Sequence, residues 1–79
     1  MVEITDVAFK ALAAGICMGI GSIAPAIGEA WVASKAMEAI GRNPSTAETI
    51  TPRMIVAMAI CESTGIYALV ISLIILFVL

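Results

Sequence analysis

The chain has 79 residues, of which 62% are hydrophobic and 13% are charged. This composition excludes a water-soluble domain, in which roughly a quarter of the residues carry charge. The chain also has no histidine, only two cysteines and a net charge of −2. These counts argue against a zinc site, a disulfide framework and a nucleic-acid-binding protein. The composition therefore predicts a small integral membrane protein.

Two apolar stretches are long enough to span a bilayer as helices. Residues 11–28 contain no charge, and residues 54–79 contain only Glu62. Because a bilayer core takes about 20 helical residues, we predict one transmembrane helix over about 6–41 and a second over about 46–79. The leader before the first helix is acidic, whereas a signal peptide begins with a basic region. The predicted fold class is an all-α transmembrane hairpin that forms a single domain over the whole chain.

A polar turn over about 42–45 joins the two predicted helices. Three of the four basic residues flank this turn, namely Lys35, Arg42 and Arg53. Cytoplasmic loops of membrane proteins carry an excess of basic residues. We therefore expect the turn in the cytoplasm and both termini on the opposite side of the membrane.

Small side chains form two stripes when the first helix is drawn with about 100° per residue. The first stripe consists of Gly15, Gly19, Ser22, Ala26 and Ala33. The second consists of Ala13, Cys17, Gly21, Ala24 and Gly28. Small residues let membrane helices approach closely, and two nearly opposite stripes let each copy contact two identical neighbours. We therefore predict a homo-oligomeric ring, with close packing inside a compact bundle as the alternative.

The other two sectors of the first helix also have predicted neighbours. The isoleucine-rich sector is expected to face the interior of the ring, and the sector with Met18, Pro25 and Glu29 to face the second helix. Pro25 removes one helical hydrogen bond, so a local bend is expected there. In the hairpin, Cys17 and Cys61 lie on the order of 20 Å apart along the helix axis, so we expect no disulfide between them.

Glu29 and Glu62 lie at nearly the same depth in an antiparallel hairpin, because they are almost equally far from the turn. A carboxylate at the bilayer centre costs at least ~3 kcal/mol, which makes it a functional site by default. Ser63, Thr64 and Tyr67 supply hydroxyl groups at this level. Each hydroxyl alone fits an ordinary role in a membrane helix. Beside two acids, they together predict an oxygen-lined cation site.

These features, in this order and spacing, resemble the c-subunit, or proteolipid, of F-type ATP synthases. The resemblance rests on the hairpin, the glycine-rich first helix, the turn Arg42-Asn43-Pro44 and the segment Glu62-Ser63-Thr64-Gly65-Ile66-Tyr67. It covers essentially the whole chain. The segment is similar to the sodium-translocating branch, which typically has glutamine where this chain has Glu29. The chain therefore resembles a two-carboxylate variant of that branch.

The resemblance implies a non-catalytic, cofactor-free component of a rotor ring in the bacterial inner membrane. Its partners would be further copies of itself, the a-subunit, the gamma and epsilon subunits of the central stalk, and membrane lipid. Each copy would bind one cation at Glu62, face the lipid with its site neutralised, and exchange the ion at the a-subunit. Ion flow would thereby drive ring rotation, which is coupled to ATP synthesis or hydrolysis.

The resemblance also implies roles for particular residues. The ligands of Na⁺ would be the carboxylates of Glu29 and Glu62, the Ser63 hydroxyl and the Ile60 backbone carbonyl. Tyr67 would hold Glu62 in place, and Thr64 would hold a water. The residues of the turn that would dock onto the stalk are Arg42, Asn43 and Pro44.

The transported ion is predicted to be Na⁺, with protons competing. A proton site needs only one carboxyl group in an apolar pocket, whereas this site collects the oxygen atoms that hard cations prefer. Two carboxylates around one monovalent ion would leave a net negative charge in lipid, so one is expected to stay protonated. The glutamine-bearing relatives favour Glu29 as the protonated partner of Glu62.

Alternative functions remain open from the sequence. A proton-translocating member of the same family would use the extra oxygens as a hydrogen-bond network. A small pore-forming hairpin, such as a holin-like channel, would also have two spans and small-residue packing, but it needs no paired acids beside a basic turn. A fragment of a multidrug transporter would use a buried glutamate, but such a transporter needs more than two helices.

Overall fold

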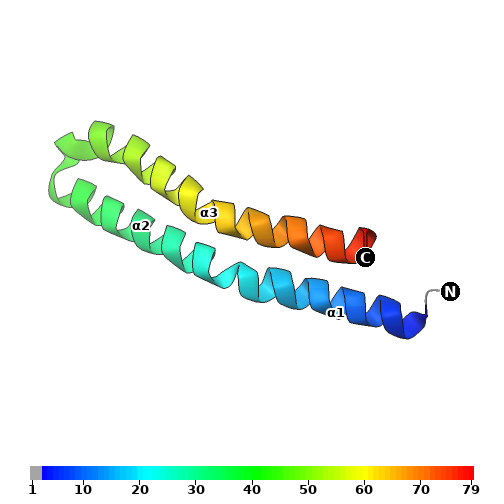
Figure 1. The fold of residues 1–79 in the computed structure, drawn as a ribbon. Helices are drawn as coiled ribbons and strands as arrows, with labels where there is room; N and C mark the ends of the chain where they lie inside the picture. Colours follow the sequence, from blue (N-terminus) through cyan, green and yellow to red (C-terminus); the bar gives the residue numbers. More distant parts are fainter. Residues whose placement is uncertain (1–2) are drawn as a thin grey trace.

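The computed structural model describes residues 3–79 and shows two antiparallel helical arms joined by a short turn (Figure 1). The first arm comprises α1 (Ile4–Gly21) and α2 (Ile23–Arg42), and the second comprises the 3₁₀ turn η1 (Pro44–Thr46) and α3 (Ala47–Phe77). The Cα atoms extend over 63 × 16 × 10 Å. The predicted all-α hairpin is thus confirmed. The start of the acidic leader, residues 1–2, lies outside the described residues.

Both arms are long and apolar enough to cross a membrane. The 31 residues of α3 extend about 46 Å at 1.5 Å per residue, whereas the hydrocarbon core is only about 30 Å thick. One end of the hairpin must therefore project beyond the hydrocarbon. The turn end fits this position, because Lys35, Arg42 and Arg53 gather there.

The first arm is interrupted at Ser22, where the sequence predicts one helix over about 6–41. Pro25 explains the interruption, because a proline has no N–H for the Gly21 carbonyl and its ring crowds that carbonyl. The backbone remains hydrogen-bonded around the interruption: the Ser22 amide donates to Met18 at 3.0 Å, and the Ala26 amide donates to Ser22 at 3.1 Å. The helix is therefore bent rather than broken. Both arms change direction near mid-length (Figure 1).

The contact between the two arms is a seam of mostly small residues. Buried and half-buried positions recur along both arms at alternating intervals of four and three residues. In the first arm they are Ala14, Met18, Gly21, Pro25, Gly28 and Val32. In α3 they are Met54, Met58, Cys61, Gly65, Ala68, Ser72 and Ile75. This 3.5-residue repeat is typical of two helices wound around each other, and the small side chains allow a close approach.

Side-chain hydrogen bonds fix the register of this seam. The Ser72 hydroxyl donates to the Ala14 carbonyl at 3.2 Å, and the Cys17 thiol donates to the Ala68 carbonyl at 3.6 Å. Both groups connect α1 with α3 in the half of the hairpin away from the turn. Cys17 and Cys61 are both free thiols, and the register keeps them at different depths.

Gly21 and Gly28 of the second small-residue stripe pack against α3 of the same chain, whereas Ala13 and Ala24 of that stripe are exposed. A Cβ atom at Gly21 would lie 2.7 Å from the Cβ of Ala68, and one at Gly28 would lie 3.4 Å from the Sγ of Cys61. The prediction used a straight helix with 3.6 residues per turn, whereas the seam repeats every 3.5 residues and includes Gly21 and Gly28. The hairpin itself needs small residues where its backbones meet.

Gly15 and Gly19 of the first stripe and the isoleucine sector remain uncovered in a single chain. A Cβ atom at Gly15 or Gly19 would meet nothing within 4 Å. The isoleucines are exposed as well, and Ile20, for example, is 66% exposed. These surfaces lie away from α3, so they remain available to a further copy of the chain or to lipid.

Gly21→Ala should destabilise the hairpin by about 1–3 kcal/mol, because the new Cβ atom would overlap with Ala68. Gly19→Ala is the matched control and should leave the hairpin stable. Unfolding by titration with sodium dodecyl sulfate, followed by the fluorescence of Trp31, measures the difference. Ala68→Gly should rescue Gly21→Ala by removing the opposing Cβ. A Gly21→Ala chain as stable as the Gly19→Ala chain would contradict this contact.

Candidate ion-binding site

Two carboxyl groups from opposite arms meet near the middle of the hairpin. Glu29 is half-buried on α2, Glu62 lies on α3, and their carboxyl groups are close enough to influence each other. An ionised carboxylate can only accept hydrogen bonds. Two ionised carboxylates so close together would repel each other, so a proton on one of them would stabilise the pair.

Gly65 makes room for the Glu62 carboxyl group, a role that the sequence pattern did not predict. Gly65 is buried, and a Cβ atom there would lie 3.3 Å from Oε1 of Glu62 and 3.7 Å from the Cβ of Pro25. A larger residue would therefore push the carboxyl group away from its present position. One signal was present in the sequence, since Gly65 follows Glu62 by three residues and residues at this spacing are neighbours on a helix surface.

Ser63 and Ile60 bring two further oxygen atoms together. The Ser63 hydroxyl donates a hydrogen bond to the Ile60 carbonyl at 2.6 Å. A serine commonly makes such a bond to the preceding helical turn. Here the bond holds a hydroxyl oxygen beside a carbonyl oxygen, and both are ligand types that hard cations accept.

Thr64 and Tyr67 have different surroundings on α3. Thr64 lines a cavity of about 180 Å³ together with Ala24, Pro25 and Cys61, which has room for a water molecule. Tyr67 is 65% exposed and makes no side-chain hydrogen bond within the described residues. The bond from Tyr67 to Glu62 that the resemblance implies is therefore not formed in a single chain.

The predicted ligands divide between different faces of α3. Gly65 and Ala68 mark the face that packs against the first arm. At 100° per residue, Glu62 lies on one flank of this face, whereas Ser63 and Tyr67 point to the outer side. Within the described residues, no three acidic, cysteine or histidine side chains gather around one point. In one chain, the two carboxyl groups thus lie together, and the Ser63 hydroxyl lies beside the Ile60 carbonyl. The four groups do not surround a single cation.

The residues of the predicted docking turn are ordered and exposed. Arg42 ends α2, and its guanidinium lies 3.4 Å from the carboxylate of Glu38. The Thr46 hydroxyl donates to the Asn43 carbonyl at 2.7 Å, and Pro44 begins η1. The turn therefore presents a defined polar surface at the end of the hairpin.

The chain is similar to known proteins over nearly its whole length. The family model for the ATP synthase c-subunit matches residues 12–75. The ATP synthase c-subunit of Petrotoga mobilis is 51% identical over 70 residues, which cover 89% of this chain and 73% of the relative. That of Thermotoga petrophila is 52% identical over 69 residues, which cover 87% of this chain and 81% of the relative. That of Dehalococcoides mccartyi is 48% identical over 69 residues, which cover 87% and 91%.

The matched region includes both arms, the turn, Glu29 and Glu62. A match of this extent also agrees with the hairpin and with the two membrane-crossing arms. The chain therefore belongs to the c-subunit family of F-type ATP synthases, the non-catalytic, ion-translocating proteins of the membrane rotor ring.

Proposed function

We propose that this rotor protein binds and transports Na⁺, with protons competing, at a site built around Glu62. The observation that best supports Na⁺ is the pairing of the Ser63 hydroxyl with the Ile60 carbonyl at 2.6 Å, on the same turn of α3 as Glu62. A proton carrier needs only a carboxyl group. The additional oxygens are useful to a hard cation, whose ligands are oxygen atoms.

The hydrogen bond between Ser63 and Ile60 is compatible with cation binding. A serine hydroxyl has one donor and two lone pairs, and a backbone carbonyl also has two lone pairs. Ser63 can therefore donate its proton to Ile60 while both oxygen atoms coordinate the same ion. The helical turn holds these two ligands together before the ion arrives, which lowers the ordering cost of binding.

The site is completed, in this proposal, by a neighbouring copy in the ring. Glu29 lies on α2, whereas Ser63 and Ile60 face the outer side of α3. A copy packed beside α3 brings further oxygen atoms opposite Ser63. This arrangement also explains why the side chains of Ile60 and Tyr67 are 67% and 65% exposed in one chain, since the neighbour covers them.

The charge of the loaded site follows from the carboxyl pair. Glu29 holds the proton and donates its hydrogen bond to an ionised Glu62. One carboxylate and one Na⁺ are together neutral, which allows the loaded site to face lipid. The a-subunit then exchanges the ion, and the rotating ring transmits the motion through the turn at Arg42, Asn43 and Pro44 to the gamma and epsilon subunits of the stalk. In this proposal the ring lies in the inner membrane of a bacterium, with the turn in the cytoplasm.

Proton transport is the second candidate, and the carboxyl pair favours it. The carboxyl groups of Glu29 and Glu62 lie near each other, and a shared proton alone could hold such a pair. In that case the bond from Ser63 to Ile60 is an ordinary contact within a membrane helix. The two candidates differ in whether Na⁺ competes with protons for Glu62.

Na⁺ should slow the labelling of Glu62 by a carbodiimide at neutral pH, because this reagent attacks the protonated acid. Purified rings are labelled at increasing Na⁺, with K⁺ at equal ionic strength as the control. Ser63→Ala removes one ligand and should raise the half-protective Na⁺ concentration about tenfold. If Na⁺ gives no protection while a higher pH does, the ring carries protons.

Glu29→Gln should preserve the protection of Glu62 by Na⁺, and this protection should no longer be lost at alkaline pH. In the wild type, a high pH strips the proton from Glu29 and leaves the loaded site with a net negative charge. Glutamine cannot lose a proton in this way, so Na⁺ transport by the variant should persist where transport by the wild type falls. The measurement is Na⁺ transport by reconstituted complexes as a function of pH. Equal alkaline decline in both would show that Glu29 is not the proton holder.

Arg42→Ala should leave ring assembly intact and reduce ATP synthesis driven by an ion gradient. The Arg42 side chain is 73% exposed and contacts Glu38 on its own helix, so it contributes little to packing. Lys35→Ala removes the same charge from the same end of the hairpin and serves as the control. Ring yield in detergent and ATP synthesis are measured for both variants. Normal synthesis by Arg42→Ala would restrict Arg42 to setting membrane orientation.

A further inference from the structure

Three glycines lie in the seam between the two arms, and Gly65 differs from the other two in what it faces. A Cβ atom at Gly21 or Gly28 would meet a side chain of the opposite arm. A Cβ atom at Gly65 would instead lie nearest to the Glu62 carboxyl group of its own helix, 3.3 Å from Oε1 and 3.7 Å from Cδ. The immediate neighbour of Gly65 is therefore the carboxyl group of the candidate site.

The packing of the two arms does not require a glycine at Gly65. The nearest atom of the opposite arm, the Cβ of Pro25, would lie 3.7 Å from a Cβ atom at this position, which is an ordinary van der Waals contact. At Gly21 the corresponding distance is 2.7 Å, at which two carbon atoms overlap. Glycine is also a poorer helix former than alanine. A methyl group at Gly65 would thus be crowded only by the Glu62 carboxyl group.

The Glu62 side chain takes an uncommon direction to reach this space. Long side chains on a helix ordinarily lean toward the N-terminus of that helix, which for Glu62 is the side of Met58 and Ala59. The Glu62 carboxyl group lies instead on the C-terminal side, over Gly65. A side chain at Gly65 would close this direction, so its absence decides where the carboxyl group lies.

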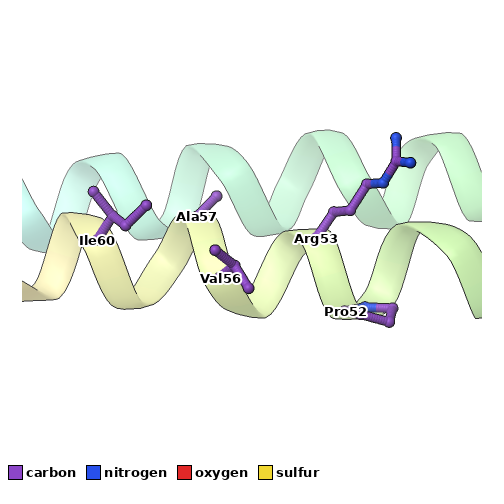
Figure 2. A pocket seen from close by; sticks show the side chains of 5 residues that line it. All are labelled: Pro52, Arg53, Val56, Ala57 and Ile60. Atoms are coloured by element: carbon purple, nitrogen blue, oxygen red, sulfur yellow. The ribbon is translucent and has the colours of Figure 1, made fainter.

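The other two oxygen atoms of the candidate site lie on a different face of α3. The Ser63 hydroxyl donates to the Ile60 carbonyl, and the Ile60 side chain lines an outer groove of this helix (Figure 2). At 100° per residue, Ile60 lies about 140° around the helix from Gly65. A methyl group at Gly65 would therefore displace the Glu62 carboxyl group and leave the pair of Ser63 and Ile60 in place.

We propose that Gly65 is a positioning residue for ion transport, which sets how tightly the Glu62 carboxyl group holds its ion. The proposal rests on Glu62 as the ion carrier of the proposed function, and it holds for Na⁺ and for protons alike. The open space at Gly65 keeps the carboxyl group in one position before the ion arrives, which lowers the ordering cost of binding. Gly65→Ala removes this position. Ion binding should then weaken roughly two- to tenfold, the effect of one side chain that must be ordered on binding.

The rate at which a carbodiimide labels Glu62 in purified rings tests the position of the carboxyl group. The rate is measured at an acid pH, where this group is protonated in every variant, so that the identity of the transported ion does not affect it. Gly65→Ala should raise the rate roughly two- to tenfold, because the carboxyl group leaves the space beside Pro25 and becomes more accessible. The concentration of the transported cation that half-saturates Glu62 should rise by a similar factor.

A double variant separates positioning from packing. Aspartate is one methylene shorter than glutamate, so the carboxyl group of Glu62→Asp does not reach Gly65. Adding Gly65→Ala to Glu62→Asp should therefore leave the labelling rate and the ion affinity of that variant unchanged. Gly41→Ala is the control, because a Cβ atom there would meet nothing within 4 Å, and it should behave like the wild type. In sodium dodecyl sulfate, Gly65→Ala should be as stable as the wild type, unlike Gly21→Ala.

An equal change of rate on adding Gly65→Ala to the wild type and to Glu62→Asp would overturn the proposal, because Gly65 would then act through the seam. An unchanged rate in Gly65→Ala would overturn it as well, and so would a loss of hairpin stability as large as that of Gly21→Ala. Failure of the proposed function has a different signature, which the wild type shows alone. If neither Na⁺ nor pH alters the labelling of the wild type, Glu62 is not the ion carrier, whatever the rates of the Gly65 variants.

Discussion

The close approach of the two arms is the contact on which the other features of this hairpin depend. Glycines and alanines along the seam let the backbones come so near that a single methyl group at Gly21 would collide with Ala68. At this separation a hydroxyl such as that of Ser72 can reach the carbonyl of Ala14 on the opposite helix. In a bilayer, apolar side chains gain little by moving from lipid into a contact between helices, because the lipid tails are apolar as well. Close packing and hydrogen bonds therefore hold the helices together.

The same seam assembles the carboxyl pair. The carboxyl groups of Glu29 and Glu62 come near each other because the arms are antiparallel, close and in this register. Gly65 is a small seam residue within the site itself, since the space of its missing side chain is used by the Glu62 carboxyl group beside Pro25. Pro25 therefore contributes twice. It packs on α3 at the level of the site, and it bends the first arm one turn away, at Ser22.

The outward-facing surface of α3 does not contact the first arm and carries different groups from the seam. Facing outward are the oxygens of Ser63 and Ile60 and the exposed ring of Tyr67. A single hairpin leaves these surfaces without a protein partner. In a rotor ring, a neighbouring copy can supply that partner, and the paired oxygens suit a cation shared with it.

The sequence by itself determined the features that depend on composition and spacing. Two uncharged stretches were sufficient to predict two membrane-crossing helices, the turn between them required the antiparallel arrangement, and the positions of Glu29 and Glu62 relative to that turn placed them at one depth. The bend at Ser22 was also foreseeable, because proline removes a hydrogen bond wherever it occurs in a helix.

Only the tertiary structure decided which face of each helix meets the other. A straight helical wheel did not place Gly21 and Gly28 in the contact between the two arms, whereas the structure packs them against Ala68 and Cys61. The physical reason is that two packed helices wind around each other with 3.5 residues per repeat, so that the contact drifts across a wheel drawn with 3.6. The three-residue spacing of Gly65 from Glu62 was visible in the sequence, but its use was not. The space matters only because the opposite arm, at Pro25, closes it from the other side.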